Sequence, residues 1–156
     1  MATVFKHSRR LSLPPAVKPG YNGLMAQAPG ASNLPRILLV EDEVDIRSIL
    51  IMALEEHYRI EAVGMGDLAL ESIKANPPDL VVMDIHMPHK NGYEVCEQLR
   101  TNPKTKNLPV IFLTGRRDGW SQARARQAGG SAFMNKPCDL HELRAKIDEL
   151  LKNRTA

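Results

Sequence analysis

The chain has 156 residues, enough to bury one substantial core, and a formal net charge of +3. Five of its 21 basic residues lie within residues 1–36, which contain no acid, so the remainder carries 16 basic and 18 acidic residues. The net positive charge therefore reflects the first 36 residues and is poor evidence that the folded part binds nucleic acid, and no stretch approaches the roughly 20 apolar residues that span a bilayer. We therefore expect a cytoplasmic protein.

Residues 1–34 are rich in proline, glycine and polar residues, and their apolar residues have no regular spacing. We expect a disordered basic leader here, with residues 35–156 forming the folded domain. A membrane-surface arm, a nucleic-acid-binding arm or an organelle-targeting peptide is the alternative interpretation of a cationic segment without acids. Met25 also offers an alternative start of translation.

From residue 36 onward, short apolar runs alternate with amphipathic stretches, which is the pattern of strand–helix units around a parallel sheet. Five strands are predicted, most of them rich in β-branched or aliphatic residues. The second has the weakest pattern of the five. They cover residues 37–40, 59–63, 80–83, 110–113 and 132–135.

Apolar residues recur at helical spacing after each of the first three predicted strands, and we expect these stripes to be core. They comprise Ile46, Ile49, Leu50, Ala53 and Leu54, then Leu68, Ala69 and Ile73, then Val95 and Leu99. The last helix has the clearest apolar face, formed by Leu140, Leu143, Ile147, Leu150 and Leu151. Asp139 is predicted to cap its start.

Polar residues directly follow four of the predicted strands. In chain order they are Glu41, Asp42 and Glu43, then Asp84, then Thr114, then Lys136. Each has an ordinary explanation, since an acid or threonine often caps a helix and a lysine is usually a solvated charge. However, ligands of open parallel sheets bind beyond the carboxyl ends of the strands. Together these residues therefore predict one site with acids, a hydroxyl and an ammonium group.

The same segments resemble receiver domains of two-component systems, the CheY-like family. The resemblance covers residues 36–153 and is carried by four blocks in the expected order: residues 39–43 (LVEDE), 81–88 (VVMDIHMP), 113–115 (LTG) and 136–137 (KP). It implies an α/β fold of the flavodoxin-like (βα)5 type, a doubly wound parallel sheet with strand order 2-1-3-4-5. Because a second folded domain has no room in this length, we expect a stand-alone response regulator.

The resemblance implies that Asp84 accepts a phosphoryl group from a histidine kinase or a histidine phosphotransfer protein. The attacking carboxylate must be ionised, and neighbouring acids would raise its pKa unless a divalent cation compensates their charge. Oxygen ligands at this density suit Mg²⁺, or Mn²⁺ in its place. We assign the metal to Asp42 and Asp84, with Glu41 binding directly or through water and, by the resemblance, with the backbone carbonyl of His86.

Lys136 is expected to pair first with Asp84 and then with a phosphate oxygen, while Thr114 donates its hydroxyl to another oxygen. The resemblance implies that Thr114 and the aromatic residue Phe133 report phosphorylation to the surface. A packing role for Phe133 is an equal alternative. The resemblance also implies a cis peptide bond before Pro137.

The resemblance also implies that two further residues border the path of the water that hydrolyses the phosphorylated carboxylate. They are His86 and Arg116, and the resemblance implies that residues at these positions tune the lifetime of the phosphorylated state. An arginine at this entrance could obstruct the water. The alternative is that Arg116 and Arg117 form a solvated pair.

Other functions fit the pattern less well. A phosphatase of the haloacid-dehalogenase class would carry a second aspartate two residues after Asp84, where this chain has His86. A receiver-like module that binds partners without phosphorylation remains the alternative. We expect a phospho-accepting switch and no enzyme, which presents the surface near Phe133 to a downstream effector protein and does not bind DNA directly.

Overall fold

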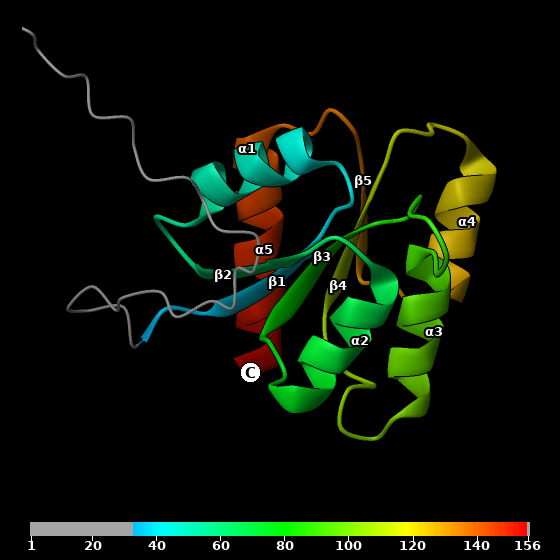
Figure 1. The fold of residues 1–156 in the computed structure, drawn as a ribbon, viewed down its shortest axis with the longest axis horizontal. Coiled ribbons are helices and arrows are strands. Elements are labelled where there is room, and N and C mark those ends of the chain that lie inside the picture. Colours follow the sequence, from blue (N-terminus) through cyan, green and yellow to red (C-terminus); the bar gives the residue numbers. More distant parts are fainter. Residues whose placement is uncertain (1–32, 156) are drawn as a thin grey trace, which may run out of the picture.

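The computed structural model describes residues 33–155, in which strands and helices alternate along the chain (Figure 1). The strands are β1 (Arg36–Val40), β2 (Arg59–Val63), β3 (Leu80–Asp84), β4 (Val110–Thr114) and β5 (Ala132–Asn135). The helices are α1 (Val44–Leu54), α2 (Gly66–Ala75), α3 (Gly92–Thr101), α4 (Gly119–Gln127) and α5 (Leu140–Thr155). Except for its last two residues, the leader predicted for residues 1–34 lies outside the described range. No helix within that range is both long and apolar enough to cross a bilayer.

The five strands form one parallel sheet of order β2-β1-β3-β4-β5, which confirms the predicted flavodoxin-like fold. All five predicted strands are present, and none differs from its predicted bounds by more than one residue. The final register pairs are Val40 with Met83 between β1 and β3, Asp84 with Leu113 between β3 and β4, and Thr114 with Asn135 between β4 and β5. The carboxyl ends of β1, β3, β4 and β5 therefore meet at one edge of the sheet.

Helices cover both faces of the sheet, as Figure 1 shows, because each central strand buries both sets of alternating side chains. In β1, Ile37 and Leu39 pack in the core under α1 and α5, whereas Leu38 and Val40 pack in the core under α2, α3 and α4. The sheet thus separates two apolar layers. The polar residues that follow its strands lie at the edge of the sheet formed by the carboxyl ends of the strands.

Two residues of the predicted core stripes lie on the surface. Ile49 is 58% exposed and Leu68 is 44% exposed. In α1 the buried positions are Leu50 and Leu54, and in α2 they include Ala69. Successive helical residues point about 100° apart, so Ile49 and Leu68, each one residue before a buried position, turn out of the core. Their prediction as core was wrong.

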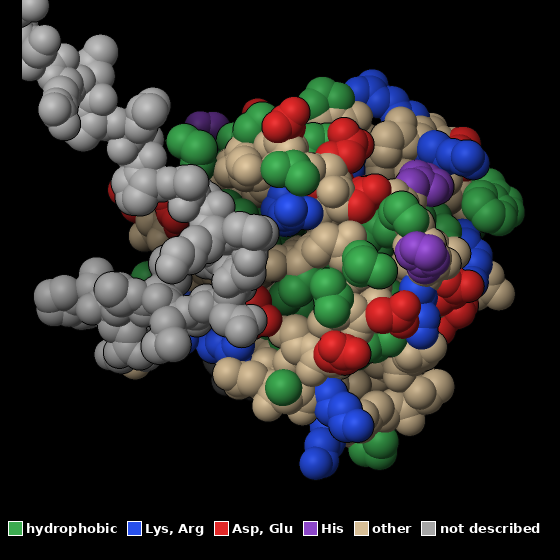
Figure 2. Space-filling view, viewed as in Figure 1, with side chains coloured by type: hydrophobic (Ala, Val, Ile, Leu, Met, Phe, Trp, Pro, Cys, Tyr) green, Lys and Arg blue, Asp and Glu red, His purple; other side chains and the backbone are tan. Residues whose placement is uncertain are grey.

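The helix α4 has no apolar stripe that would have predicted it. Its buried residues are Ser121 and Ala125, and its sequence GWSQARARQ is otherwise mostly polar. Figure 2 shows basic side chains along the edge of the molecule that α4 occupies in Figure 1. The helix begins because the side chain of Asp118 accepts a hydrogen bond from the Ser121 N–H at 2.6 Å.

Candidate functional site

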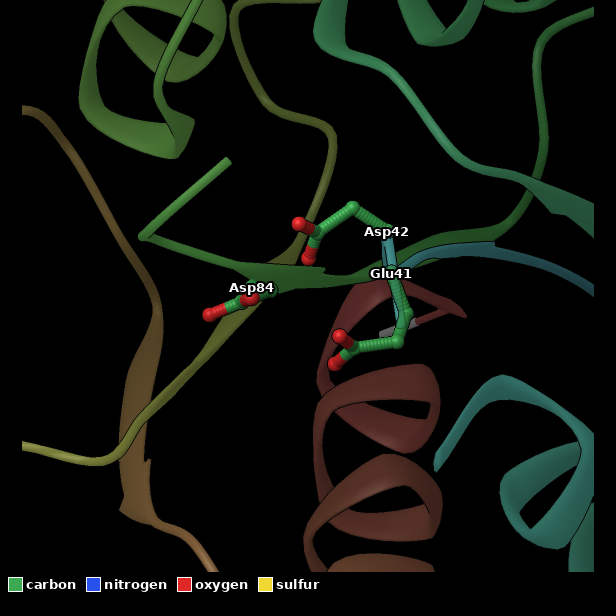
Figure 3. A group of neighbouring side chains, drawn as sticks. All are labelled: Glu41, Asp42 and Asp84. Atoms are coloured by element: carbon green, nitrogen blue, oxygen red, sulfur yellow. The ribbon is translucent and has the colours of Figure 1, made fainter. Parts of the chain in front are cut away.

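The alternation of the strands determines which polar side chains meet at the sheet edge. Glu41, Asp84 and Lys136 each lie two residues beyond a strand residue of the core under α1 and α5. They therefore point to the same side of the sheet. Figure 3 shows the carboxylates of Glu41 and Asp42, from the end of β1, gathered with that of Asp84 at the end of β3.

A lysine connects the two buried acids of this group. Lys136 Nζ lies 2.6 Å from Glu41 Oε2 and 3.2 Å from Asp84 Oδ2. Glu41 is completely buried and Asp84 is 4% exposed. Buried carboxylates need such partners, because an unpaired charge out of water is costly. The structure thus brings together Glu41, Asp84 and Lys136, as the strand ends predicted.

Burial of the cluster raises the pKa of both of its buried acids. Burial raises the pKa of Asp84, and Lys136 and the His86 N–H only partly oppose this effect. Burial likewise raises the pKa of Glu41, against the hydrogen bond from Lys136. Burial alone would lower the pKa of Lys136, but its bonds to the two carboxylates raise it. Lys136 thus opposes the effect of burial on both carboxyls without cancelling it.

The acids also have the arrangement of a cation site. Glu41, Asp42 and Asp84 each offer a carboxylate oxygen, and these oxygens lie within 4.8 Å of one another. Among residues 33–155 this is the one group of three or more acids, histidines or cysteines with such spacing. An all-oxygen donor set suits a hard divalent cation such as Mg²⁺. The residues present fit the predicted metal.

Backbone contacts hold the remaining predicted residues near the cluster. The His86 N–H donates to Asp84 Oδ1 at 3.2 Å, which brings residue 86 to the site, although its side chain is exposed. The buried Thr114 accepts a hydrogen bond from the Arg116 N–H on its hydroxyl and one from the Lys136 N–H on its carbonyl, at 3.1 and 2.7 Å. The metal role of the His86 carbonyl stays a prediction.

The structure separates two predicted residues from the charged cluster. Phe133 lies in β5, partly buried against the core under α2, α3 and α4. The Arg116 side chain is exposed, and within the described range it makes no hydrogen bond or ion pair. The bond between Lys136 and Pro137 is cis, as predicted.

One contact of the site has no signal that we recognised in the sequence. Arg47, in α1, donates through Nη1 to the backbone carbonyl of Glu41 at 2.7 Å. The helical stripe of α1 suggested only packing. The contact depends on how α1 leaves the sheet.

A hollow of about 550 Å³ lies apart from these acids, where α2 and the segment before α3 meet α3. Its charged lining residues already have partners: Asp67 pairs with Lys90 within the lining, Glu97 pairs with Arg124, and Glu94 completes the cap of α3. The acid cluster at the sheet edge is therefore the stronger candidate site.

Comparison with known proteins gives a consistent result. A sequence profile of the family described as "Response regulator receiver domain" matches residues 37–148. The phosphate regulon transcriptional regulatory protein PhoB of Rhizobium meliloti is 33% identical over 120 residues, which are 76% of this chain and 53% of PhoB. The hybrid signal transduction histidine kinase D of Dictyostelium discoideum is 32% identical over 124 residues, 80% of this chain but 8% of that protein.

A solved structure is similar over the same region. The signal receiver domain of a signal transduction histidine kinase from Syntrophus aciditrophicus has a TM-score of 0.72 and 33% identity, covering 76% of this chain and 91% of that one. The chain thus spans about half of PhoB and a small part of the hybrid kinase. What the relatives share with it is one domain.

Proposed function

The chain belongs to the response regulator receiver domain family, and from this premise we propose that it accepts a phosphoryl group on Asp84. Receiver domains are phospho-accepting switches of two-component systems, and histidine kinases phosphorylate them. The observation that carries the assignment is the position of Asp84, at the end of a central strand, paired with Lys136 and beside Asp42. In this proposal the chain promotes only its own phosphorylation and dephosphorylation.

The chemistry assigns a role to each contact. An Asp84 oxygen attacks the phosphorus of a phosphohistidine, a P–O bond forms and the P–N bond breaks, with the electron pair leaving on the histidine nitrogen. Lys136 moves its charge from the carboxylate to a phosphate oxygen. Thr114 donates its hydroxyl to another phosphate oxygen.

A divalent cation, Mg²⁺ or Mn²⁺, would be held by Asp42 and Asp84 with the His86 carbonyl. When bound, it supplies positive charge that offsets both the carboxylates and the incoming phosphate. Glu41 is already engaged on both oxygens, one by Lys136 and the other by the Glu43 N–H at 3.2 Å. A contact from Glu41 to the cation through water fits these bonds better than a direct one.

Signalling would follow from Thr114, whose hydroxyl leaves the Arg116 N–H when it turns to the phosphate. Phe133 lies on the neighbouring strand, two residues before the register partner of Thr114. A change there alters the surface of β5 that an effector protein would contact. Receiver domains interact with histidine kinases and phosphotransfer proteins, and we propose a protein effector in preference to DNA.

Dependence on the cation tests the chemistry. Incubation with acetyl phosphate and Mg²⁺ should add one phosphoryl group to the protein, as measured by intact mass. The same incubation with excess chelator should add little or none, since the acids then lack their counter-charge. Equal labelling in both conditions would refute the assigned metal site, and no labelling in either would favour a module that works without phosphorylation.

A further inference from the structure

The side chain of Asp42 has no partner that fixes its position. Glu41 and Asp84 are both held by Lys136 and each also accepts a backbone N–H. By contrast, no hydrogen bond or ion pair engages the Asp42 carboxylate within residues 33–155. The direction of this carboxylate therefore depends on how firmly the backbone on either side of it is held.

Arg47 holds that backbone on both sides. Its Nη1 donates to the carbonyl of Glu41, directly before Asp42, at 2.7 Å. Its main-chain N–H donates to the carbonyl of Glu43, directly after Asp42, at 2.9 Å. The bond to Glu43 is part of the first turn of α1, whereas the bond to Glu41 requires the guanidinium group of Arg47.

The guanidinium group has space because residue 64, just beyond β2, is a glycine. A methyl group at position 64 would lie 3.0 Å from Arg47 Nη1 and 3.8 Å from the Glu41 carbonyl oxygen. The first distance is tighter than ordinary van der Waals contact, so the end of the arginine would have to move. Gly64 and Arg47 thus form one unit with the turn that carries Asp42.

We infer that Arg47 is a positioning residue for the divalent cation, with Gly64 providing its space. This inference rests on the metal site of the proposed function and adds to it a residue that touches neither metal nor phosphate. Fixing the Glu41 carbonyl orients the Glu41–Asp42 peptide and with it the ligand carboxylate. A ligand held in its binding direction loses less freedom when the cation binds.

The positive charge of Arg47 allows a positioning role to be distinguished from a purely electrostatic effect on Mg²⁺ binding. A cation next to the site repels Mg²⁺, so its removal should tighten metal binding if charge alone mattered. Loss of positioning has the opposite effect. The sign of the change in the Mg²⁺ dissociation constant therefore distinguishes the two roles.

The test is the Mg²⁺ dissociation constant, measured by calorimetry without phosphodonor. We expect Arg47→Ala to weaken binding about fivefold, the scale of one net hydrogen bond. Gly64→Ala keeps the charge and displaces the guanidinium, so it should weaken binding about twofold. In the Arg47→Ala background, Gly64→Ala should have no further effect, because the group it displaces is gone.

Arg59→Ala is the matched control, since it removes an exposed arginine of β2 and the same charge. Urea unfolding of each variant separates a folding defect from a binding defect. Unchanged or tighter Mg²⁺ binding in both Arg47→Ala and Gly64→Ala would overturn the positioning role while leaving the metal site intact. Absence of Mg²⁺ binding by the unmodified protein would overturn the metal site and this inference with it.

Discussion

At the scale of single residues, Lys136 makes the buried acids compatible with folding. It contacts both Glu41 and Asp84, each almost or fully buried. Burial raises the pKa of both carboxyls, and the contacts with Lys136 oppose this effect. In the proposed function, the same lysine would also bind a phosphate oxygen once Asp84 is phosphorylated.

Arg116 is expected to lengthen the life of the phosphorylated state. Its backbone N–H donates to the hydroxyl of Thr114, which is the group predicted to bind a phosphate oxygen. If the exposed guanidinium obstructs the hydrolytic water, Arg116→Ala should shorten the half-life several-fold, a barrier change of about 1 kcal/mol. The measurement is decay of the phosphorylated protein after removal of the phosphodonor.

Arg117→Ala provides the comparison, since Arg117 is the exposed neighbour of Arg116. This variant should decay at the rate of the unmodified protein, and the Mg²⁺ affinity of both variants should stay close to the original value. An equal or longer half-life for Arg116→Ala would support the solvated-pair interpretation instead.

At the scale of elements, we expect α4 to depend strongly on its cap. It buries only Ser121 and Ala125, so packing contributes little to its stability. Asp118→Ala should therefore speed hydrogen exchange of the α4 amides several-fold, whereas Asp118→Asn, which keeps a capping acceptor, should change it little. Equal hydrogen-exchange rates of the α4 amides in the unmodified protein, Asp118→Ala and Asp118→Asn would show that the cap is dispensable.

Tyr58 connects the segment before β2 to α5. Its hydroxyl donates to Asp148 Oδ1 at 2.6 Å, and the residue is 4% exposed. Tyr58→Phe should lower the free energy of unfolding at pH 7 by about 1–2 kcal/mol, because the bond to a charged acceptor is lost. Urea unfolding of both proteins measures the difference.

The same bond predicts a pH dependence. Burial, followed by the Asp148 contact, raises the pKa of Tyr58 well above its ordinary value. Because its pKa is raised in the folded state, the Tyr58 hydroxyl makes its full contribution to the free energy of unfolding below about pH 10. That contribution is lost as the pH rises further. The stability difference between the protein and Tyr58→Phe should shrink from pH 7 to pH 11, and an undiminished difference would contradict this.

The elements differ in how far the sequence could predict them. The central strands β3 and β4 were predictable because both of their faces are buried, which leaves continuous apolar runs. The polar residues after the predicted strands then pointed to Asp84, Thr114 and Lys136. The position of α4 could not be predicted, because nothing in its sequence marks a buried face. Arg47 was also missed, since its contact joins a helix to the preceding turn through tertiary geometry.

At the scale of the whole molecule, the proposed metal site would couple Mg²⁺ binding to stability. The three acids come from two strands, so they are close together only in the folded chain. A cation that binds this state stabilises it by about 2.7 kcal/mol at one hundred times its dissociation constant. Mg²⁺ should therefore raise the unfolding temperature relative to chelator, and Asp42→Asn should remove most of this rise. An equal rise in that variant would place the cation elsewhere.

The most direct test of the central claim is the position of the phosphoryl group. The protein, Asp84→Asn and the control Asp79→Asn are incubated with acetyl phosphate and Mg²⁺, and their intact masses are compared. Asp79 is an acid at the opposite end of β3, where it accepts a hydrogen bond from the Arg36 N–H. We predict one added phosphoryl group on the unmodified protein and on Asp79→Asn, and none on Asp84→Asn. Undiminished labelling of Asp84→Asn would contradict the account.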